Sequence, residues 1–95
     1  MSDNKSQEFY NRLTQQLAED RQWPAQYMFK FIVPGIQERV EAVCDFFDAT
    51  QADIRIKNSS KGNYSSISIT LTMASPEAVV QKYQEVSVVE GVISL

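Results

Sequence analysis

The chain has 95 residues, which suits one domain and is too short for two independent cores. Its hydrophobic share of 43% is enough for one globular core and too high for the chain to be a disordered tail. The net charge is −3. The chain has no histidine and one cysteine, and these two counts exclude histidine-based catalysis, His/Cys zinc sites and an internal disulfide.

Residues 1–20 are polar and lack the apolar core of a signal peptide. No run in the sequence approaches the ~18 apolar residues that a membrane-spanning helix requires. A single cysteine fits a reducing compartment. We therefore expect a cytoplasmic protein with no membrane partner.

Residues 5–21 carry Phe9, Leu13 and Leu17 at a spacing of four, which predicts a helix with a narrow apolar stripe. Trp23-Pro24 ends this helix, because proline disfavours helical geometry in the residue before it. So thin a stripe must dock on something. We expect residues 1–24 to form a helical extension that packs either on its own domain or on another chain.

A strand follows over residues 27–33, where Tyr27, Phe29, Phe31 and Val33 share one face. Pro34-Gly35 ends it, and the period then changes to that of a helix. One apolar stripe along this helix contains Ile36, Val40, Val43, Cys44 and Phe47.

The second half of the sequence predicts two more strands, a helix and a short final strand. Residues 52–58 form the first strand, with Ile54 and Ile56 inward. Residues 59–63 form a turn in which glycine and asparagine tolerate positive φ, and residues 64–73 alternate hydroxyl and aliphatic side chains. Ser75-Pro76 reads as a helix start, and residues 92–95 as the last strand.

After the first helix the order is strand–helix–strand–strand–helix–strand. This order predicts an α+β domain over residues 25–95, the ferredoxin-like split βαβ arrangement. Two helices would cover one face of an antiparallel sheet. Right-handed connections would place the strands of residues 27–33 and 64–73 at its centre.

No residue pattern indicates catalysis or metal binding, so we expect no enzyme, no metal and no cofactor. Cys44 lies on the apolar stripe of a helix, which favours a buried packing thiol. The hydroxyls of residues 64–73 have no histidine partner. Asp45, Asp48 and Asp53 match no calcium-loop spacing.

The stretch 51–74 is the one basic part of an acidic chain. On the sheet face away from the helices we expect a basic set of residues, Lys30, Arg55 and Lys57, beside the hydroxyls of Ser66, Ser68, Thr70 and Thr72. RNA-recognition sheets place aromatic residues on this face, so we do not expect nucleic-acid binding. The face could be covered by the first helix, pack on a second subunit or bind a small anion. Alternatively, Arg55 and Lys57 only prevent mispairing of an edge strand.

The turn Ser59-Ser60-Lys61-Gly62-Asn63-Tyr64 allows two interpretations. One is an ordinary hairpin loop. The other is an anion cradle made of two hydroxyls, an ammonium group and exposed backbone N–H groups.

The segments YMFKFIVPG and KNSSKGNYSSISITLTMASPEAVVQKY resemble the YbeD-like family of small bacterial proteins of unknown function. The resemblance covers roughly residues 25–95. The family signature falls on Phe29, Lys30, Ser59, Ser60, Lys61, Gly62 and Tyr64. Two features depart from the pattern: the segment before Trp23 is an extension, and Lys57-Asn58 replaces the arginine or proline expected before the two serines.

The resemblance implies a ferredoxin-like fold similar to ACT regulatory domains, with no established enzymatic activity. ACT domains bind small effectors, often amino acids, near the loop after their first strand, which is here Pro34-Gly35. Our first hypothesis is therefore a regulatory domain that senses a small anionic or amino-acid effector and self-associates. The alternative is a protein-interaction adaptor that docks through the N-terminal helix, Phe46 or the basic sheet face. Nucleic-acid binding through Lys30, Arg55, Lys57 and Lys61 comes third.

Overall fold

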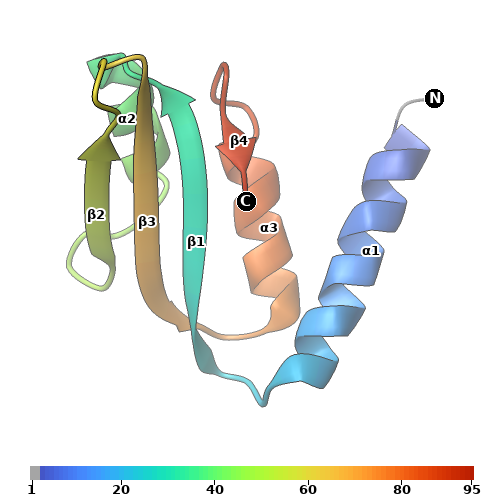
Figure 1. Cartoon of the computed structure of the whole chain (residues 1–95). Helices are drawn as coiled ribbons and strands as arrows, with labels where there is room; N and C mark the ends of the chain where they lie inside the picture. The colour runs from blue at the N-terminus through green and yellow to red at the C-terminus, as the bar shows by residue number, and fades with distance from the viewer. Residues whose placement is uncertain (1–2) are drawn as a thin grey trace.

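The computed structural model describes residues 3–95, with side chains from residue 7 onward. In chain order the elements are α1 (Asp3–Asp20), β1 (Ala25–Pro34), α2 (Gln37–Cys44), β2 (Asp53–Asn58), β3 (Tyr64–Met73), α3 (Pro76–Val86) and β4 (Ile93–Ser94). Three helices and one four-stranded antiparallel sheet confirm the predicted α+β class (Figure 1).

The strand order in the sheet is β2-β3-β1-β4. β1 and β3 pair over ten residues, from Ala25 opposite Met73 to Pro34 opposite Tyr64. β4 is much shorter than the strand expected over residues 92–95, and it pairs with β1 only at Phe31 and Ile32. The sheet is therefore built on its two long central strands.

The alternation of side chains in β1 and β3 is confirmed by their burial. Phe29, Phe31 and Val33 of β1 and Ile67 and Ile69 of β3 are fully buried. Period-two patterning puts all of these side chains on one face of the sheet, where the helices cover them.

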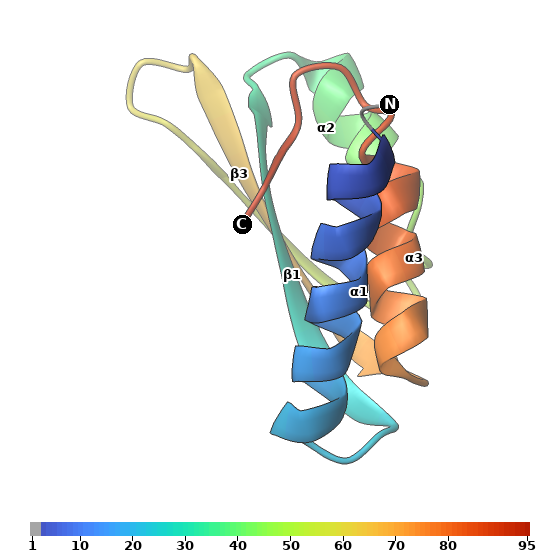
Figure 2. The ribbon, with the colours of Figure 1, turned by 90° about the vertical axis from the view of Figure 1, so that its right-hand side faces the viewer.

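All three helices lie on the same side of the sheet (Figure 2). α3 begins as predicted: the Ser75 hydroxyl accepts a hydrogen bond from the Ala78 N–H at 3.1 Å, and Pro76 fills the first turn. α2 has no comparable cap, because its N-cap residue is Ile36. Among the helices in residues 3–95, none has both the length and the apolar character needed to cross a membrane.

The N-terminal helix α1 packs beside α3. Leu17 is buried in the core, and the Trp23 indole N–H donates to the Leu17 carbonyl at 2.9 Å. The extension thus docks on its own domain. It lies on the helix side of the sheet and does not cover the open face (Figure 2). The expectation that the first helix covers the open face is therefore wrong.

Two local predictions of burial are also wrong. Ile56 lies opposite buried Ile67 and so faces the helix side, but it is 49% exposed because it lies on the edge strand β2 and borders the open cavity between β2 and α2. Ile36 is 47% exposed at the start of that helix, and Phe47 lies beyond its end although it is buried. The turn predicted over residues 59–63 is confirmed, and its positive φ falls on Gly62, at 74°.

Candidate functional site

The structure brings together the two predicted ligand-binding segments, which are separate in sequence. The N–H of Gly35 donates a hydrogen bond to the carbonyl of Asn63 at 2.8 Å. The neighbouring residue Pro34 lies opposite Tyr64 in the β1–β3 register. The loop after β1 and the β2–β3 hairpin therefore form one corner of the molecule.

Gly35 is required for this close approach. A Cβ atom at this position would clash with the carbonyl oxygen of Gly62. A backbone atom cannot move aside as a flexible side chain can, so only glycine fits here without displacing the hairpin.

A cavity of about 240 Å³ lies in this corner, on the helix side of the hairpin. It is lined by Gly35, Gln37, Val40, Ile56, Asn58, Gly62 and Ser65. In the first turn of α2 the Arg39 N–H donates to the Ile36 carbonyl at 2.9 Å, and no side chain caps the N–H groups of the two residues before it. Buried Ser65 donates to the Asn58 side-chain oxygen at 2.8 Å, which leaves the Asn58 amide NH₂ group as a donor.

Several polar groups of the hairpin are used within the turn itself. The Ser59 hydroxyl accepts from the Tyr64 N–H at 3.1 Å, the Ser59 N–H donates to the Tyr64 carbonyl at 2.8 Å, and the Gly62 N–H donates to the Ser59 carbonyl at 2.9 Å. These bonds hold the turn in shape. They also remove the Ser59 N–H as an anion ligand, because it is already engaged, whereas the Ser59 hydroxyl only accepts and keeps its O–H as a donor.

A second hollow of about 240 Å³ lies on the open-face side of the hairpin, lined by Ile32, Lys57, Asn58, Ser59, Tyr64 and Ser66. The predicted site residues are thus divided. Gly35 and Gly62 line the first cavity, and Ser59 and Tyr64 line the second. Three predicted residues, Pro34, Ser60 and Lys61, line neither of these two cavities.

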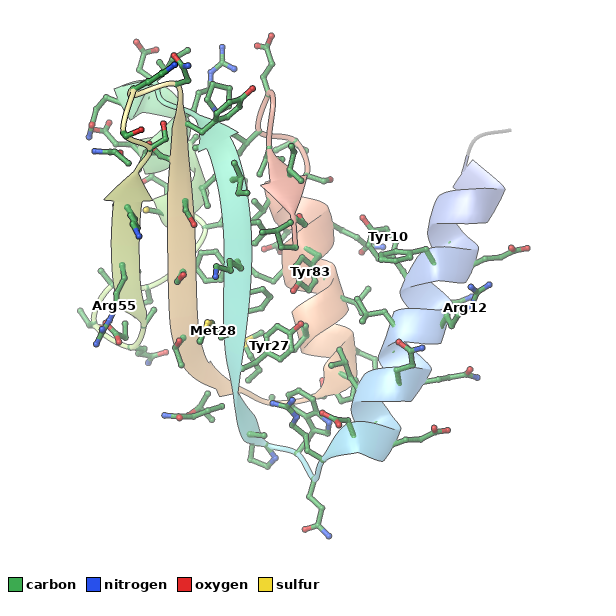
Figure 3. The ribbon with its side chains drawn as sticks, in the orientation of Figure 1. Tyr10, Arg12, Tyr27, Met28, Arg55 and Tyr83 are labelled. Carbon is green, nitrogen blue, oxygen red and sulfur yellow. The ribbon has the colours of Figure 1, made fainter. Side chains whose placement is uncertain are left out.

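The predicted basic sheet face exists, but its charge is partly neutralised. Lys30 and Arg55 lie in one row across the sheet, since both pair with Ser68. Arg55 forms an exposed ion pair with Asp53 at 3.2 Å. Figure 3 labels Arg55 on β2 and Met28 on β1, and the side chain of Met28 is 58% exposed. The face is therefore a mixture of basic and apolar side chains.

Nothing in the described residues adds a reactive centre to this picture. Burial, followed by the nearby charges of Asp45 and Glu41, raises the pKa of the Cys44 thiol, which is the behaviour of a packing residue. Within residues 3–95 no group of three His, Cys, Asp or Glu side chains could hold a metal ion. The expectation that the protein is not an enzyme stays a prediction.

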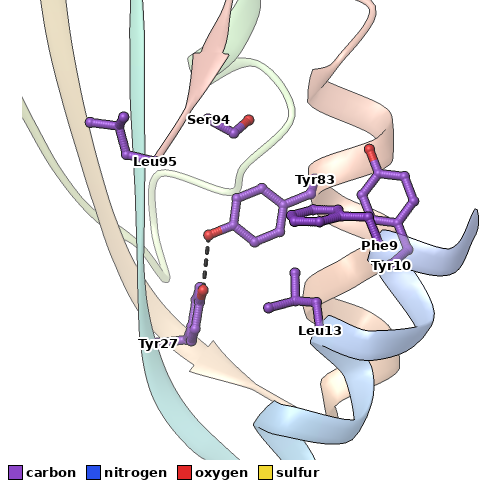
Figure 4. A pocket seen from close by; sticks show the side chains of 7 residues that line it. All are labelled: Phe9, Tyr10, Leu13, Tyr27, Tyr83, Ser94 and Leu95. Carbon is purple, nitrogen blue, oxygen red and sulfur yellow. Dashed lines mark hydrogen bonds between the residues drawn. The ribbon is translucent and has the colours of Figure 1, made fainter. Parts of the chain in front are cut away.

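Sequence reasoning missed one site completely. The hydroxyl oxygens of Tyr27 and Tyr83 are joined by a hydrogen bond of 2.8 Å, beside a cavity of about 200 Å³ (Figure 4). The cavity is lined by Phe9, Tyr10, Leu13, Tyr27, Tyr83, Ser94 and Leu95. The available signal was the choice of tyrosine instead of phenylalanine at two core positions, since a buried hydroxyl needs a partner.

The comparisons with known proteins agree with the resemblance seen in the sequence. Residues 18–95 match the family model described as "Protein of unknown function (DUF493)". The chain is 31% identical over 74 residues to a UPF0250 protein of Shewanella halifaxensis (strain HAW-EB4), covering 75% of this chain and 84% of that protein. No solved structure matches the chain. The match over α2, α3 and all four strands shows that the chain belongs to the DUF493 (UPF0250, YbeD-like) family of small proteins of unknown function.

Proposed function

We propose that this protein is a non-catalytic regulatory domain with a ferredoxin-like, ACT-like fold, and that it senses a small anionic or amino-acid effector. The effector would bind in the corner cavity between the Pro34-Gly35 loop and the hairpin. One observation carries the proposal: the first turn of α2, which no side chain caps, contributes Gln37 and Val40 to the lining of that cavity.

The chemistry of the corner favours an anionic group. Free N–H groups and the helix dipole make a helix N-terminus attractive to carboxylates and phosphates. The Asn58 amide adds an N–H donor to the same cavity, while the Gln37 side-chain nitrogen, which also lines it, donates to the Glu41 carboxylate at 2.9 Å. A volume of about 240 Å³ suits a metabolite smaller than the usual drug-sized ligand.

A second candidate is a protein-interaction adaptor, which includes self-association. It is favoured by apolar side chains that remain exposed outside the core: Phe9 at 60%, Met28 at 58% and Ile93 at 53%. Met28 and Ile93 both lie on strands of the open face, where a partner would cover them. Nucleic-acid binding is a weaker third candidate, because the described basic residues are few and Arg55 is already paired.

The test is thermal unfolding against a panel of amino acids, nucleotides and anionic metabolites. A ligand at 100 times its Kd stabilises the folded state by about 2.7 kcal/mol, which is roughly 10 °C or more for a domain of this size. Ile36→Asp supplies both a cap and a negative charge at the start of α2. This variant should unfold at a higher temperature without ligand and lose the response to it.

Gln15→Glu is the matched control, because it adds the same charge at an exposed position of α1. It should keep the full response. A response that survives Ile36→Asp would place the effector elsewhere, and a flat panel accompanied by a concentration-dependent dimer in light scattering would favour the adaptor.

A further inference from the structure

The cavity beside Tyr27 and Tyr83 is built by four separate elements. Phe9, Tyr10 and Leu13 come from α1, Tyr27 from β1, Tyr83 from α3, and Ser94 and Leu95 from the β4 region (Figure 4). α1 is fastened at its C-terminal end, where Leu17 is buried, while Phe9 is 60% exposed. The helix therefore closes one end of the space and leaves the other accessible.

The lining is aromatic and carries no charged side chain. Its side-chain polar atoms are all hydroxyls, from three tyrosines and one serine. A charged ligand would lose its hydration here without gaining a counter-charge. The lining accordingly selects an uncharged molecule with a flat apolar body.

The tyrosine pair gives this apolar cavity one polar anchor. Its two hydroxyls carry two protons, and one of these is used in the 2.8 Å bond between them. One O–H donor and several lone pairs remain available. A single ligand hydroxyl can both accept and donate at such a pair.

We propose that this cavity binds a small uncharged aromatic molecule of one or two rings that bears one hydroxyl group. The ring would pack among Phe9, Tyr10 and Leu13, and the hydroxyl would bond to the Tyr27–Tyr83 pair. The volume of about 200 Å³ sets the size, because an apolar cavity of ~150 Å³ is known to take benzene.

The site is independent of the proposed effector corner. Its α1 wall precedes residue 18, where the family match begins, so the N-terminal extension contributes half of the aromatic lining. No residue is shared between the two cavities. Failure of one proposal therefore leaves the other standing.

The test is a titration of the full chain with 2-naphthol, followed by calorimetry and by amide chemical shifts. We expect saturable binding, with shifts centred on Leu13, Tyr27 and Tyr83. Phe9→Ala removes an exposed wall of the cavity and should weaken binding about three- to tenfold. Val88→Ala is the control, since Val88 is also an exposed apolar residue, at 75%, but does not line this cavity.

The role of the hydroxyl pair is tested with Tyr27→Phe/Tyr83→Phe. Removing both hydroxyls together leaves no buried group unpaired, so the fold should survive. The affinity for 2-naphthol should fall about tenfold, to that of naphthalene, while the affinity for naphthalene stays unchanged. The charged analogue 2-naphthoate should bind at least tenfold more weakly than 2-naphthol.

Several results would overturn the proposal. These are the absence of saturable binding, binding that Phe9→Ala leaves intact, or shifts centred on Gly35 and Gly62. If light scattering shows a dimer that Phe9→Ala dissociates, while 2-naphthol does not bind, a second copy of the chain covers the cavity and the ligand proposal is wrong.

Discussion

The Tyr27 and Tyr83 hydroxyl oxygens lie 2.8 Å apart and join the first strand to the last helix across 56 positions of the sequence. The Tyr83 ring also packs edge-on against Phe29, with a centroid distance of 5.1 Å. Burial is the main reason that the pKa of Tyr83 is raised far above its ordinary value, and the bond to Tyr27 adds to it. The phenol therefore keeps its proton to a higher pH in the folded protein than in the unfolded chain.

The first prediction concerns stability at alkaline pH. The folded-state pKa of Tyr83 exceeds the unfolded value of about 10, so unfolding releases a proton only above that pH. The free energy of unfolding should not depend on this group below about pH 10. Above it, stability should fall by up to about 1.4 kcal/mol per pH unit. Urea unfolding between pH 8 and 11 measures this dependence.

Tyr83→Phe is the control for that measurement, because it removes the titrating hydroxyl and keeps the ring. The alkaline fall should be shallower in this variant than in the parent protein. Equal slopes in the two proteins would assign the pH dependence to other groups.

The second prediction compares the loss of stability on replacing Gly35 and on replacing Gly62. Gly35→Ala places a Cβ against the Gly62 carbonyl and should destabilise the protein by about 2–3 kcal/mol. Gly62→Ala meets no atom within 4 Å and is strained only by its φ of 74°, so the loss should be about 1 kcal/mol. Chemical denaturation of both variants checks the ranking, which the reverse order would contradict.

The third prediction concerns Lys82 on α3. Its ammonium donates to the Phe46 carbonyl at 2.7 Å, lies over the Phe47 ring at 5.2 Å and pairs with Glu85 at 3.0 Å. Lys82→Met keeps much of the apolar stem but leaves the Phe46 carbonyl without this donor. We expect a loss of about 1–2 kcal/mol in the free energy of unfolding.

Lys57→Met serves as the comparison for Lys82, since Lys57 is exposed on the edge strand β2. It should change stability by less than about 0.5 kcal/mol. Similar losses in the two variants would mean that the contacts of Lys82 contribute little.

The fourth prediction tests the helix start at Ser75. Ser75→Ala removes the hydroxyl that accepts from the Ala78 N–H and should cost about 1 kcal/mol. Ser60→Ala, in the exposed hairpin, changes the same chemical group and should have little effect. Thermal unfolding of the two variants side by side provides the measurement.

The two central strands, β1 and β3, could be predicted because their alternating side chains allow only one of the two faces to be buried. Phe29 and Phe31 alternate with Met28 and Lys30, so a strand must bury the aromatic pair. Ile56 follows the same local rule and yet is 49% exposed. What covers it depends on how far α2 extends over the sheet, and local patterning contains no information on that.

The candidate site could be predicted only in pieces. Gly35 and Gly62 each indicated a turn, but their meeting depends on the β1–β3 register that sets Pro34 opposite Tyr64. The Tyr27–Tyr83 cavity depends on where α1 docks, which is determined by tertiary packing. Long-range packing is thus the part that the sequence patterns leave open.

Because β4 is short, part of the central strand β1 has no paired strand on its β4 side. The last bond on this side runs from the Leu95 N–H to the Lys30 carbonyl. Further along β1, the Arg21 guanidinium donates to the Gln26 carbonyl at 3.0 Å. Met28 lies between these two points, on a stretch that could recruit a strand from another molecule. α1 stands on this side of β1 (Figure 1). A strand that added to this edge would therefore have to fit beside the N-terminal helix.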